Sequence, residues 1–249
     1  MVDLTYQDSV AILKLNRSVT NALNLECVKE MSKALHEIKS NPQIHGVVVG
    51  SSNEKFFSIG FDIPELFGAS EENVRRFYTT FNRTCLDLYT LPKPTVVAIT
   101  GHAVAGGCIV ALCCDYRLIS EGRKFMGLNE IKLGVPVPYL GHCVLQSLVG
   151  TRQARDLTET GKFYEPERLL EMGVVDEILP LNQVLTKAIE KARGLGSMPA
   201  DAYGLIKRNR VETVQAQVLL HWEEKEALFI KCWHSDQARK QLREAMAKF

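Results

Sequence analysis

The chain has 249 residues, of which 46% are apolar and 24% charged, and its formal net charge is +1. This composition is typical of a globular protein with a substantial core and excludes extensive disorder. The near-neutral balance of charge gives no electrostatic basis for nucleic acid or an anionic membrane as a partner.

Seven cysteines occur without a CxxC pair, and several lie inside apolar runs, which favours reduced thiols in a cytosol-like compartment. The six histidines lack metal-ligand spacing, so we expect no metal site. The acidic first residues, Met1 to Asp8, resemble neither a secretory signal nor a transit peptide. The chain ends Ala247-Lys248-Phe249, without the usual peroxisomal tripeptide, and we expect a cytoplasmic protein.

The first third of the chain alternates strand and helix patterns. Val10 to Leu15 is apolar except at Lys14 and predicts a strand. Asn24 is a candidate N-cap for a helix whose apolar residues recur at helical spacing as far as Ile38. Val47 to Val49 predicts a short strand buried on both faces.

The middle of the chain repeats this pattern. A helix is predicted over about 71–91, a buried strand over 95–100, a helix over 109–114, and strands over 115–120 and 124–127. Strand-and-turn units thus recur near residues 46, 95 and 115. This recurrence predicts a stack of similar units rather than one open sheet.

After Pro138 the pattern is mainly helical, with Gly150 and Gly161 as candidate C-caps and a last short strand over 174–178. From Asn182 onward we expect three helices, over 182–195, 199–230 with a break near Arg208, and 235–247. The sequence therefore predicts an α/β core over residues 1–195 and a helical C-terminal region over residues 196–249.

Two turns and one glutamate carry the chemical signal. The turns are Ser58 to Asp62 and Ala105 to Cys108, and each follows a predicted strand and precedes a predicted helix. Such turns leave backbone N–H groups without partners at the helix N-terminus. Two such N–H groups that point at one carbonyl oxygen form an oxyanion hole. A nearby carboxylate such as Glu130 can then remove a proton from the carbon next to that carbonyl group.

Taken singly, each residue has a simpler interpretation. Gly60 fits a turn that needs positive φ, and Gly106 fits a close-packing pair of glycines at a helix start. Glu130 on its own fits an ion-paired surface glutamate, and Asp62 fits an N-cap better than a catalyst. The cluster from Leu228 to Trp233 fits the core or a subunit contact.

Read together, the segments resemble the crotonase (enoyl-CoA hydratase/isomerase) superfamily over essentially the whole chain. Phe57 to Ile63 is similar to that superfamily's first oxyanion loop, usually FSAGxDL, and Pro94 to Cys108 is similar to its second. Thr158 to Gly161 and Gly173 to Ile178 resemble its later LTG and GLVdev stretches. The resemblance implies a crotonase-like spiral of ββα units with a helical C-terminal region that mediates trimerisation.

The resemblance also implies roles for individual residues. The N–H groups of Phe61 and Gly106 would bind the thioester oxygen of an acyl-CoA, with Glu130 as the single acid/base. Further substrate contacts are implied for Ser58, Ile59, Gly60, Asp62, Ile63, Ile109 and Asn129.

Hydratases of this superfamily carry two catalytic glutamates. Glu130 matches the second, whereas Ile109 occupies the position of the first and cannot activate water. One carboxylate in an apolar wall suits a proton shuttle instead. The nearest subgroup is the mitochondrial-type Δ3-Δ2-enoyl-CoA isomerase, which resembles Ala105 to Leu112 and Gly127 to Glu130 and also has an aliphatic residue at the Ile109 position.

The resemblance therefore implies an isomerase that shifts the double bond of 3-enoyl-CoA to the trans-2 position in fatty acid β-oxidation. Its substrate brings coenzyme A, so no further cofactor is expected, and a homotrimer or a hexamer is implied. A weak hydratase, a thioester hydrolase or a decarboxylase remains open within the superfamily. A non-catalytic scaffold that binds acyl-CoA or RNA is the alternative of another class.

Overall fold

The computed structural model describes residues 1–247 and contains two β-sheets. The larger sheet has, in spatial order, β1 (Val2–Gln7), β2 (Val10–Leu15), β3 (Gly46–Ser51), β5 (Thr95–Ile99), β7 (Tyr116–Ser120) and β9 (Glu177–Leu179). The smaller sheet has β4 (Phe56–Ser58), β6 (His102–Val104) and β8 (Met126–Gly127). All neighbouring strands are parallel except β1 and β2, which form an antiparallel pair.

Along the chain, successive strands alternate between the two sheets from β3 to β8. Three pairs of consecutive strands each place the first strand in the large sheet and the second in the small one, namely β3 and β4, β5 and β6, and β7 and β8. This repetition confirms the predicted α/β spiral of strand-and-helix units. The predicted strand over 10–15 is confirmed, and Asn24 caps its helix by accepting a 3.0 Å hydrogen bond from the Cys27 N–H.

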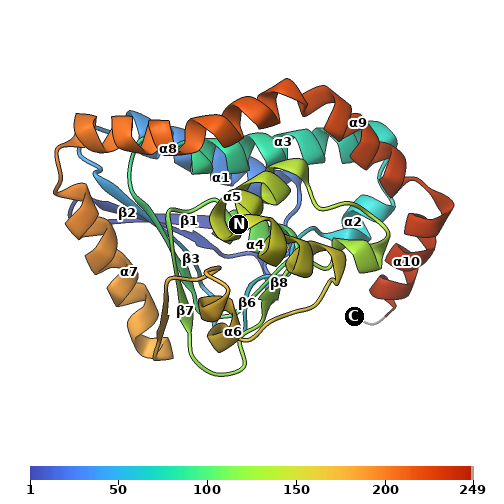
Figure 1. Ribbon diagram of the computed structural model, residues 1–249, viewed down its shortest axis with the longest axis horizontal. Helices are drawn as coiled ribbons and strands as arrows, with labels where there is room; N and C mark the ends of the chain where they lie inside the picture. Colours follow the sequence, from blue (N-terminus) through green and yellow to red (C-terminus); the bar gives the residue numbers. More distant parts are fainter. Residues whose placement is uncertain (248–249) are drawn as a thin grey trace.

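Helices cover the sheets from several sides (Figure 1). Helix α7 (Leu181–Gly196) packs on β2, β3, β5 and β7, while α8 (Ala200–Leu220) and α9 (Trp222–Trp233) run along the edge of the molecule beside α3 (Glu71–Tyr89). Helix α10 (Asp236–Met246) then turns back toward α2 (Ile63–Phe67). The remaining helices are α1 (Leu25–Ser40), α4 (Gly106–Leu112), η1 (Glu130–Leu133), α5 (Tyr139–Glu159) and α6 (Pro166–Glu171).

Several predicted boundaries were wrong. The break expected near Arg208 lies at His221 instead, and α8 is continuous past Arg208, where the neighbouring Lys207 is buried against Asp115. The last strand covers 177–179 rather than 174–178, and β1 was not predicted. Gly150, with a φ of 75°, kinks the chain between two helical stretches that together form α5.

No helix within residues 1–247 is both long and apolar enough to cross a membrane. Residues 248 and 249, the end of the predicted C-terminal region, lie outside the described part of the chain. The homotrimer or hexamer inferred from the resemblance remains a prediction.

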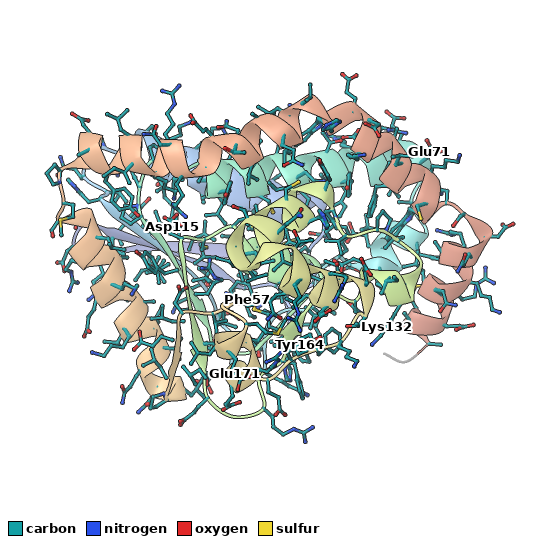
Figure 2. The ribbon with its side chains drawn as sticks, viewed as in Figure 1. Phe57, Glu71, Asp115, Lys132, Tyr164 and Glu171 are labelled. Carbon is teal, nitrogen blue, oxygen red and sulfur yellow. The ribbon has the colours of Figure 1, made fainter. Side chains whose placement is uncertain are left out.

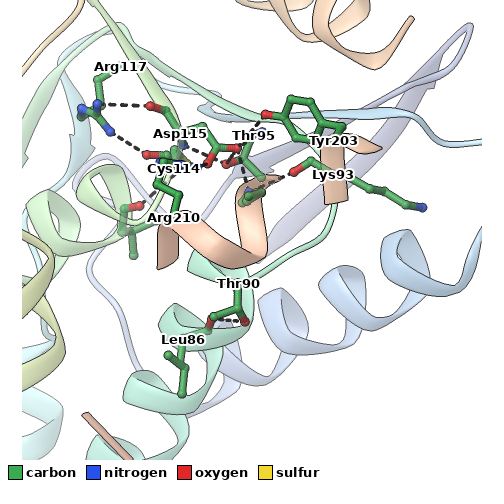
Figure 3. Close-up of polar contacts among 11 residues, drawn as sticks. Leu86, Thr90, Lys93, Thr95, Cys114, Asp115, Arg117, Tyr203 and Arg210 are labelled. Atoms are coloured by element: carbon green, nitrogen blue, oxygen red, sulfur yellow. Dashed lines mark hydrogen bonds and ion pairs between the residues drawn. The ribbon is translucent and has the colours of Figure 1, made fainter. Parts of the chain in front are cut away.

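A buried ion-pair cluster anchors α8 to the large sheet (Figure 3). The Asp115 carboxylate accepts hydrogen bonds from Lys207 Nζ at 2.7 Å and from the Thr95 N–H at 2.8 Å, and it also pairs with Arg210. The side chains of Asp115 and Lys207 are only 5% and 2% exposed. Burial alone would raise the pKa of the Asp115 carboxyl, but the charges of Lys207 and Arg210 outweigh it and hold that pKa below its ordinary value.

We expect Asp115→Asn to lower the free energy of unfolding by roughly 3–5 kcal/mol, because it leaves the Lys207 ammonium buried without a counter-charge. Urea denaturation monitored by circular dichroism measures this change. The control is Glu190→Gln, which breaks the ion pair of Glu190 with Lys187. The side chain of Glu190 is 51% exposed and that of Lys187 is 46% exposed. That variant should change stability by less than about 1 kcal/mol. Equal effects of the two substitutions would contradict the anchoring role.

Candidate active site

The predicted chemical residues follow the three strands of the small sheet. Phe61 comes three residues after β4, Gly106 two residues after β6, and Glu130 three residues after β8. These strands are parallel, so their carboxyl ends meet at one edge of the sheet. The fold therefore brings together three segments that are far apart in the sequence, at the edge where ligands bind in parallel sheets.

Hydrogen bonds on either side of Phe61 orient its amide. The Leu23 N–H donates to the Gly60 carbonyl at 2.7 Å, and the Asp62 N–H donates to the Leu23 carbonyl at 2.9 Å. The Gly60 carbonyl and the Phe61 N–H belong to one trans peptide group and point in opposite directions, so the N–H of Phe61 faces away from Leu23. Among residues 1–247 it has no acceptor.

The Gly106 amide is free for a different reason. Gly106 is the first residue of α4, so its N–H has no acceptor within the helix, and the described part of the chain offers none elsewhere. The preceding residue, Ala105, has a φ of 49°, an unfavourable conformation for a residue with a side chain. Its own N–H donates to the Gly127 carbonyl at 2.9 Å, which fixes the turn beside β8.

The two amide-bearing loops are in direct contact. A Cβ added to Gly60, which has a φ of 91°, would lie 2.8 Å from the Gly106 nitrogen. A Cβ added to Gly106 would lie 2.9 Å from ring carbons of Phe61. The Phe61 ring is itself held edge-on by Phe77 and Phe81 of α3, each with its centroid 4.8 Å away. Both glycines are thus required by the close approach of the loops.

Glu130 is buried, although the next two residues of its short 3₁₀ helix, η1, are exposed. It is 5% exposed, and its Oε2 has no hydrogen-bond partner among the described residues. Burial raises the pKa of the Glu130 carboxyl to about 8, and the hydrogen bond from its own backbone N–H lowers it only in part. The simpler interpretation of Glu130 as an ion-paired surface residue is excluded by this environment.

The C-terminal helices hold the Glu130 turn in place. The Val135 N–H donates to the Glu130 carbonyl at 3.2 Å, and the Cys232 thiol lies 3.1 Å from the Gly134 carbonyl oxygen. Gly134 also packs so closely on α10 that a Cβ there would lie 2.9 Å from the Ala238 Cα. The position of the carboxyl group therefore depends on α9 and α10.

A cavity of about 550 Å³, within the usual size range of ligand sites, contains all three groups. Of the residues predicted to contact substrate, those that line it are Ile59, Phe61, Asp62, Ile63, Gly106, Asn129 and Glu130. Three buried polar atoms without partners belong to its lining, namely Asn129 Oδ1, Glu130 Oε2 and Trp233 Nε1.

Three predicted residues do not line the cavity. Ser58 is fully buried, and its hydroxyl accepts from the Gly60 N–H at 3.1 Å, so it supports the loop from behind. Gly60 lies in that loop and contributes the close approach described above. Ile109 is fully buried against α5, where a Cβ on Gly141 would lie 2.9 Å from its Cγ1.

Asp62 is not available as a second base. Its carboxylate accepts from the Glu65 N–H at 3.1 Å, which confirms it as an N-cap, and it pairs with Arg17 at 2.7 Å. Glu130 is therefore the one lining carboxylate in residues 1–247 without a cationic or capping partner. No group of three or more His, Cys, Asp or Glu side chains in the described chain is placed to hold a metal ion.

The sequence did not reveal the rest of the lining. Phe229 and Trp233 of α9 were assigned to the core or a subunit contact, and they are indeed buried, but they also form part of the cavity wall. Ala245 and Met246 of α10 lie on the same wall. No local motif marks these residues, because only the return of the C-terminal helices over the small sheet brings them there.

This arrangement favours one kind of chemistry. Two free amides at adjoining loops stabilise negative charge on a carbonyl oxygen, and an unpaired carboxyl group in an apolar wall exchanges a proton with a neighbouring carbon. An enolate formed beside a carbonyl group is the simplest species that needs both.

Comparisons with known proteins agree with this chemistry. A family model described as enoyl-CoA hydratase/isomerase matches residues 5–249. The mouse mitochondrial enoyl-CoA delta isomerase 1 is 36% identical over 180 residues, covering 72% of this chain and 62% of the mouse protein. The short-chain-enoyl-CoA hydratase of Clostridium acetobutylicum is 31% identical over 83% of this chain and 79% of its own length.

Among solved structures, the human mitochondrial delta3-delta2-enoyl-CoA isomerase has a TM-score of 0.95 and 27% identity, with 99% of this chain and 97% of that chain covered. The match to the mouse relative spans less than two thirds of that protein's length.

The raised pKa of Glu130 predicts a pH-dependent cost to folding. In the folded state the Glu130 carboxyl keeps its proton up to about pH 8, whereas its ordinary pKa is 4.5. The free energy of unfolding therefore falls as the pH rises between these two values, by about 1.4 kcal/mol per pH unit. Glu130→Gln should therefore match the wild type near pH 5 and become more heat-stable than it by pH 9. Thermal melts across this range measure the difference, with the exposed Glu171→Gln as control. A constant difference would contradict the raised pKa.

Proposed function

The chain belongs to the enoyl-CoA hydratase/isomerase family, and we propose that within it the protein is a Δ3-Δ2-enoyl-CoA isomerase of fatty acid β-oxidation. The observation that carries this proposal is the single unpaired carboxyl group of Glu130, buried in the same cavity as two free amides. The similarity to mouse and human proteins named as isomerases supports it.

The proposed reaction needs only these groups. The thioester oxygen of a 3-enoyl-CoA accepts hydrogen bonds from the N–H groups of Phe61 and Gly106. Ionised Glu130 removes a proton from C2, and the electron pair left behind is delocalised over C2, C4 and the thioester oxygen. The two amides bind this dienolate more strongly than the substrate, because the oxygen has gained charge. The Glu130 carboxyl then returns the proton to C4, which leaves the double bond between C2 and C3.

Burial of Glu130 favours the second proton transfer, from the carboxyl group to C4. A carboxyl group surrounded by apolar atoms keeps the proton it has taken, since few water molecules compete for it. Its raised pKa also makes it a stronger base once ionised, which suits removal of a weakly acidic proton.

Hydration of a 2-enoyl-CoA is the second candidate, because relatives named as hydratases are also similar to this chain. That reaction adds water across a double bond, and two carboxylates share its proton transfers in the family mechanism. Ile109 occupies the place of one of them and is sealed against α5, while Asp62 is paired with Arg17. These contacts favour isomerisation.

We expect Glu130→Gln to reduce isomerisation of 3-hexenoyl-CoA by at least about 10²-fold, as for loss of a positioned base, while binding of the CoA ester changes little. Steady-state absorbance assays measure the first quantity and fluorescence titration the second. Hydration of crotonyl-CoA, assayed alongside, should be far slower than isomerisation in the wild type.

The matched control is Glu171→Gln, a neutralised glutamate on the exposed surface of α6, which should keep full activity (Figure 2). A Glu130→Gln enzyme with more than about a tenth of wild-type turnover would rule out the proposed base. Faster hydration than isomerisation in the wild type would favour the hydratase.

A further inference from the structure

One buried hydrogen-bond donor in the cavity wall takes no part in the proposed reaction. The Trp233 side chain is 1% exposed, and its Nε1 has no hydrogen-bond partner among the described residues. Trp233 belongs to α9 and lines the same cavity as Glu130. An indole N–H can only donate, so it requires an acceptor atom. A buried donor without an acceptor lowers the stability of a protein, and native structures contain few of them.

The side chains next to Trp233 do not supply this acceptor. The Phe229 ring has its centroid 6.1 Å from that of Trp233, and the two ring planes are 26° apart. The indole N–H lies in the plane of its own ring, so it does not point at the face of the Phe229 ring. Glu130 does not supply the acceptor either, since its Oε2 is likewise without a partner. An acceptor must therefore come from a bound ligand.

The aromatic contacts of the cavity wall separate Trp233 from the oxyanion hole. The Phe61 ring, which follows one of the two free amides, meets the Phe229 ring edge-on with the centroids 6.5 Å apart. Trp233 comes one helical turn after Phe229 and packs on that ring. In the part of the chain that the structure describes, the Phe61 ring contacts Phe77, Phe81 and Phe229 but not Trp233. The indole is thus separated by Phe229 from the place where the thioester oxygen would bind.

A plain hydrocarbon chain would leave the indole N–H unpaired. Leu133, Val135 and Phe229 line the cavity with apolar atoms, which contact a ligand but accept no hydrogen bond. An acyl chain of carbon and hydrogen alone would cover the N–H of Trp233 without satisfying it. A hydroxyl or keto oxygen on that chain would accept its hydrogen bond. Sites that form a hydrogen bond to one group of a substrate discriminate strongly against the analogue that lacks this group.

We propose that Trp233 is a specificity-determining residue whose indole N–H donates a hydrogen bond to an oxygen atom on the acyl chain of the substrate. The preferred substrate is then a 3-enoyl thioester that carries a hydroxyl or keto group beyond its double bond. This inference rests on the proposed function for the reaction itself and adds the chemical class of the acyl chain. Proton transfer by Glu130 is the same for plain and oxygenated chains.

The first test is a scan of substrates. It compares 3-decenoyl-CoA with derivatives that carry one hydroxyl group or one keto group at each position from C6 to C9. At one or more positions, oxygen should raise kcat/KM about tenfold or more over the plain ester, mainly through KM. A gain in either series supports the proposal and tells an alcohol from a ketone. A scan in which no oxygenated ester exceeds the plain ester overturns it.

Two variants separate the hydrogen bond from the packing of α9. Trp233→Phe keeps an aromatic ring but removes the N–H, and it should reduce the advantage of the oxygenated ester to less than about twofold. The matched control is Trp222→Phe, because Trp222 is the other tryptophan of the chain and also belongs to α9, but it lies outside the cavity lining. That variant should keep the full advantage. Equal loss in both variants would contradict a role for the Trp233 N–H.

A second measurement needs neither turnover nor a variant of Trp233. The protein labelled with nitrogen-15 gives one NMR signal for each of its two indole N–H groups, and Trp222→Phe identifies that of Trp233. The saturated hydroxy- and oxodecanoyl-CoA esters of the same series cannot isomerise. At least one of them should move the Trp233 proton signal downfield relative to decanoyl-CoA, because its oxygen accepts the hydrogen bond.

The NMR result distinguishes this inference from the proposed function. Equal shifts with decanoyl-CoA and with every oxygenated ester overturn the role of Trp233, whether or not the protein is an isomerase. A selective downfield shift in a protein without isomerase activity supports the acyl-chain site and rejects the proposed reaction instead.

Discussion

The buried carboxyl group of Glu130 is the constraint on which the other features of the site depend. An unpaired carboxyl in an apolar wall raises the cost of ionisation, as its pKa of about 8 reflects. A fold keeps such a group only if the surrounding contacts hold it there, and in this protein they come from Val135, Gly134 and α10. Asn129 Oδ1 and Trp233 Nε1, both in the same cavity wall, are likewise unpaired. Three of the six buried side-chain atoms without a partner in residues 1–247 thus lie where a ligand can satisfy them.

The repeating fold explains why the amides face the same cavity. Each unit adds one strand to the small sheet, and the three segments after β4, β6 and β8 meet at one edge of it. The two loops are strained where the N–H groups are left free. Gly60 lies very close to the Gly106 nitrogen, and Ala105 has an unfavourable φ. The C-terminal helices complete the cavity and support the Glu130 turn. Asp115, labelled in Figure 2, binds Lys207 and so fastens α8 to the large sheet.

Sequence patterns predicted the spiral, most of its strands, the Asn24 and Asp62 caps, and the three segments that meet in the cavity. Those features depend on local signals such as apolar strands, capping side chains and glycines in turns. The wall formed by Phe229, Trp233 and Met246 was missed because it depends on where distant helices pack. Likewise the contacts of His102 with Phe56 and Phe125 were missed, because β4, β6 and the residue before β8 come together only in the folded chain. The break near Arg208 was wrongly predicted because the polar residues around it hide a buried contact, that of Lys207 with Asp115, which the apolar periodicity cannot show.

The most direct test of a dry, single-carboxyl shuttle follows one hydrogen atom. A 3-hexenoyl-CoA labelled with deuterium at C2 would be converted in a single turnover in ordinary water, and the label at C4 of the product measured by mass spectrometry and NMR. If Glu130 carries the proton within the cavity, a substantial share of the transferred deuterium appears at C4. If C4 instead receives only solvent hydrogen, the carboxyl group is open to water or a second base acts, and Glu130 is not a dry, solitary proton carrier.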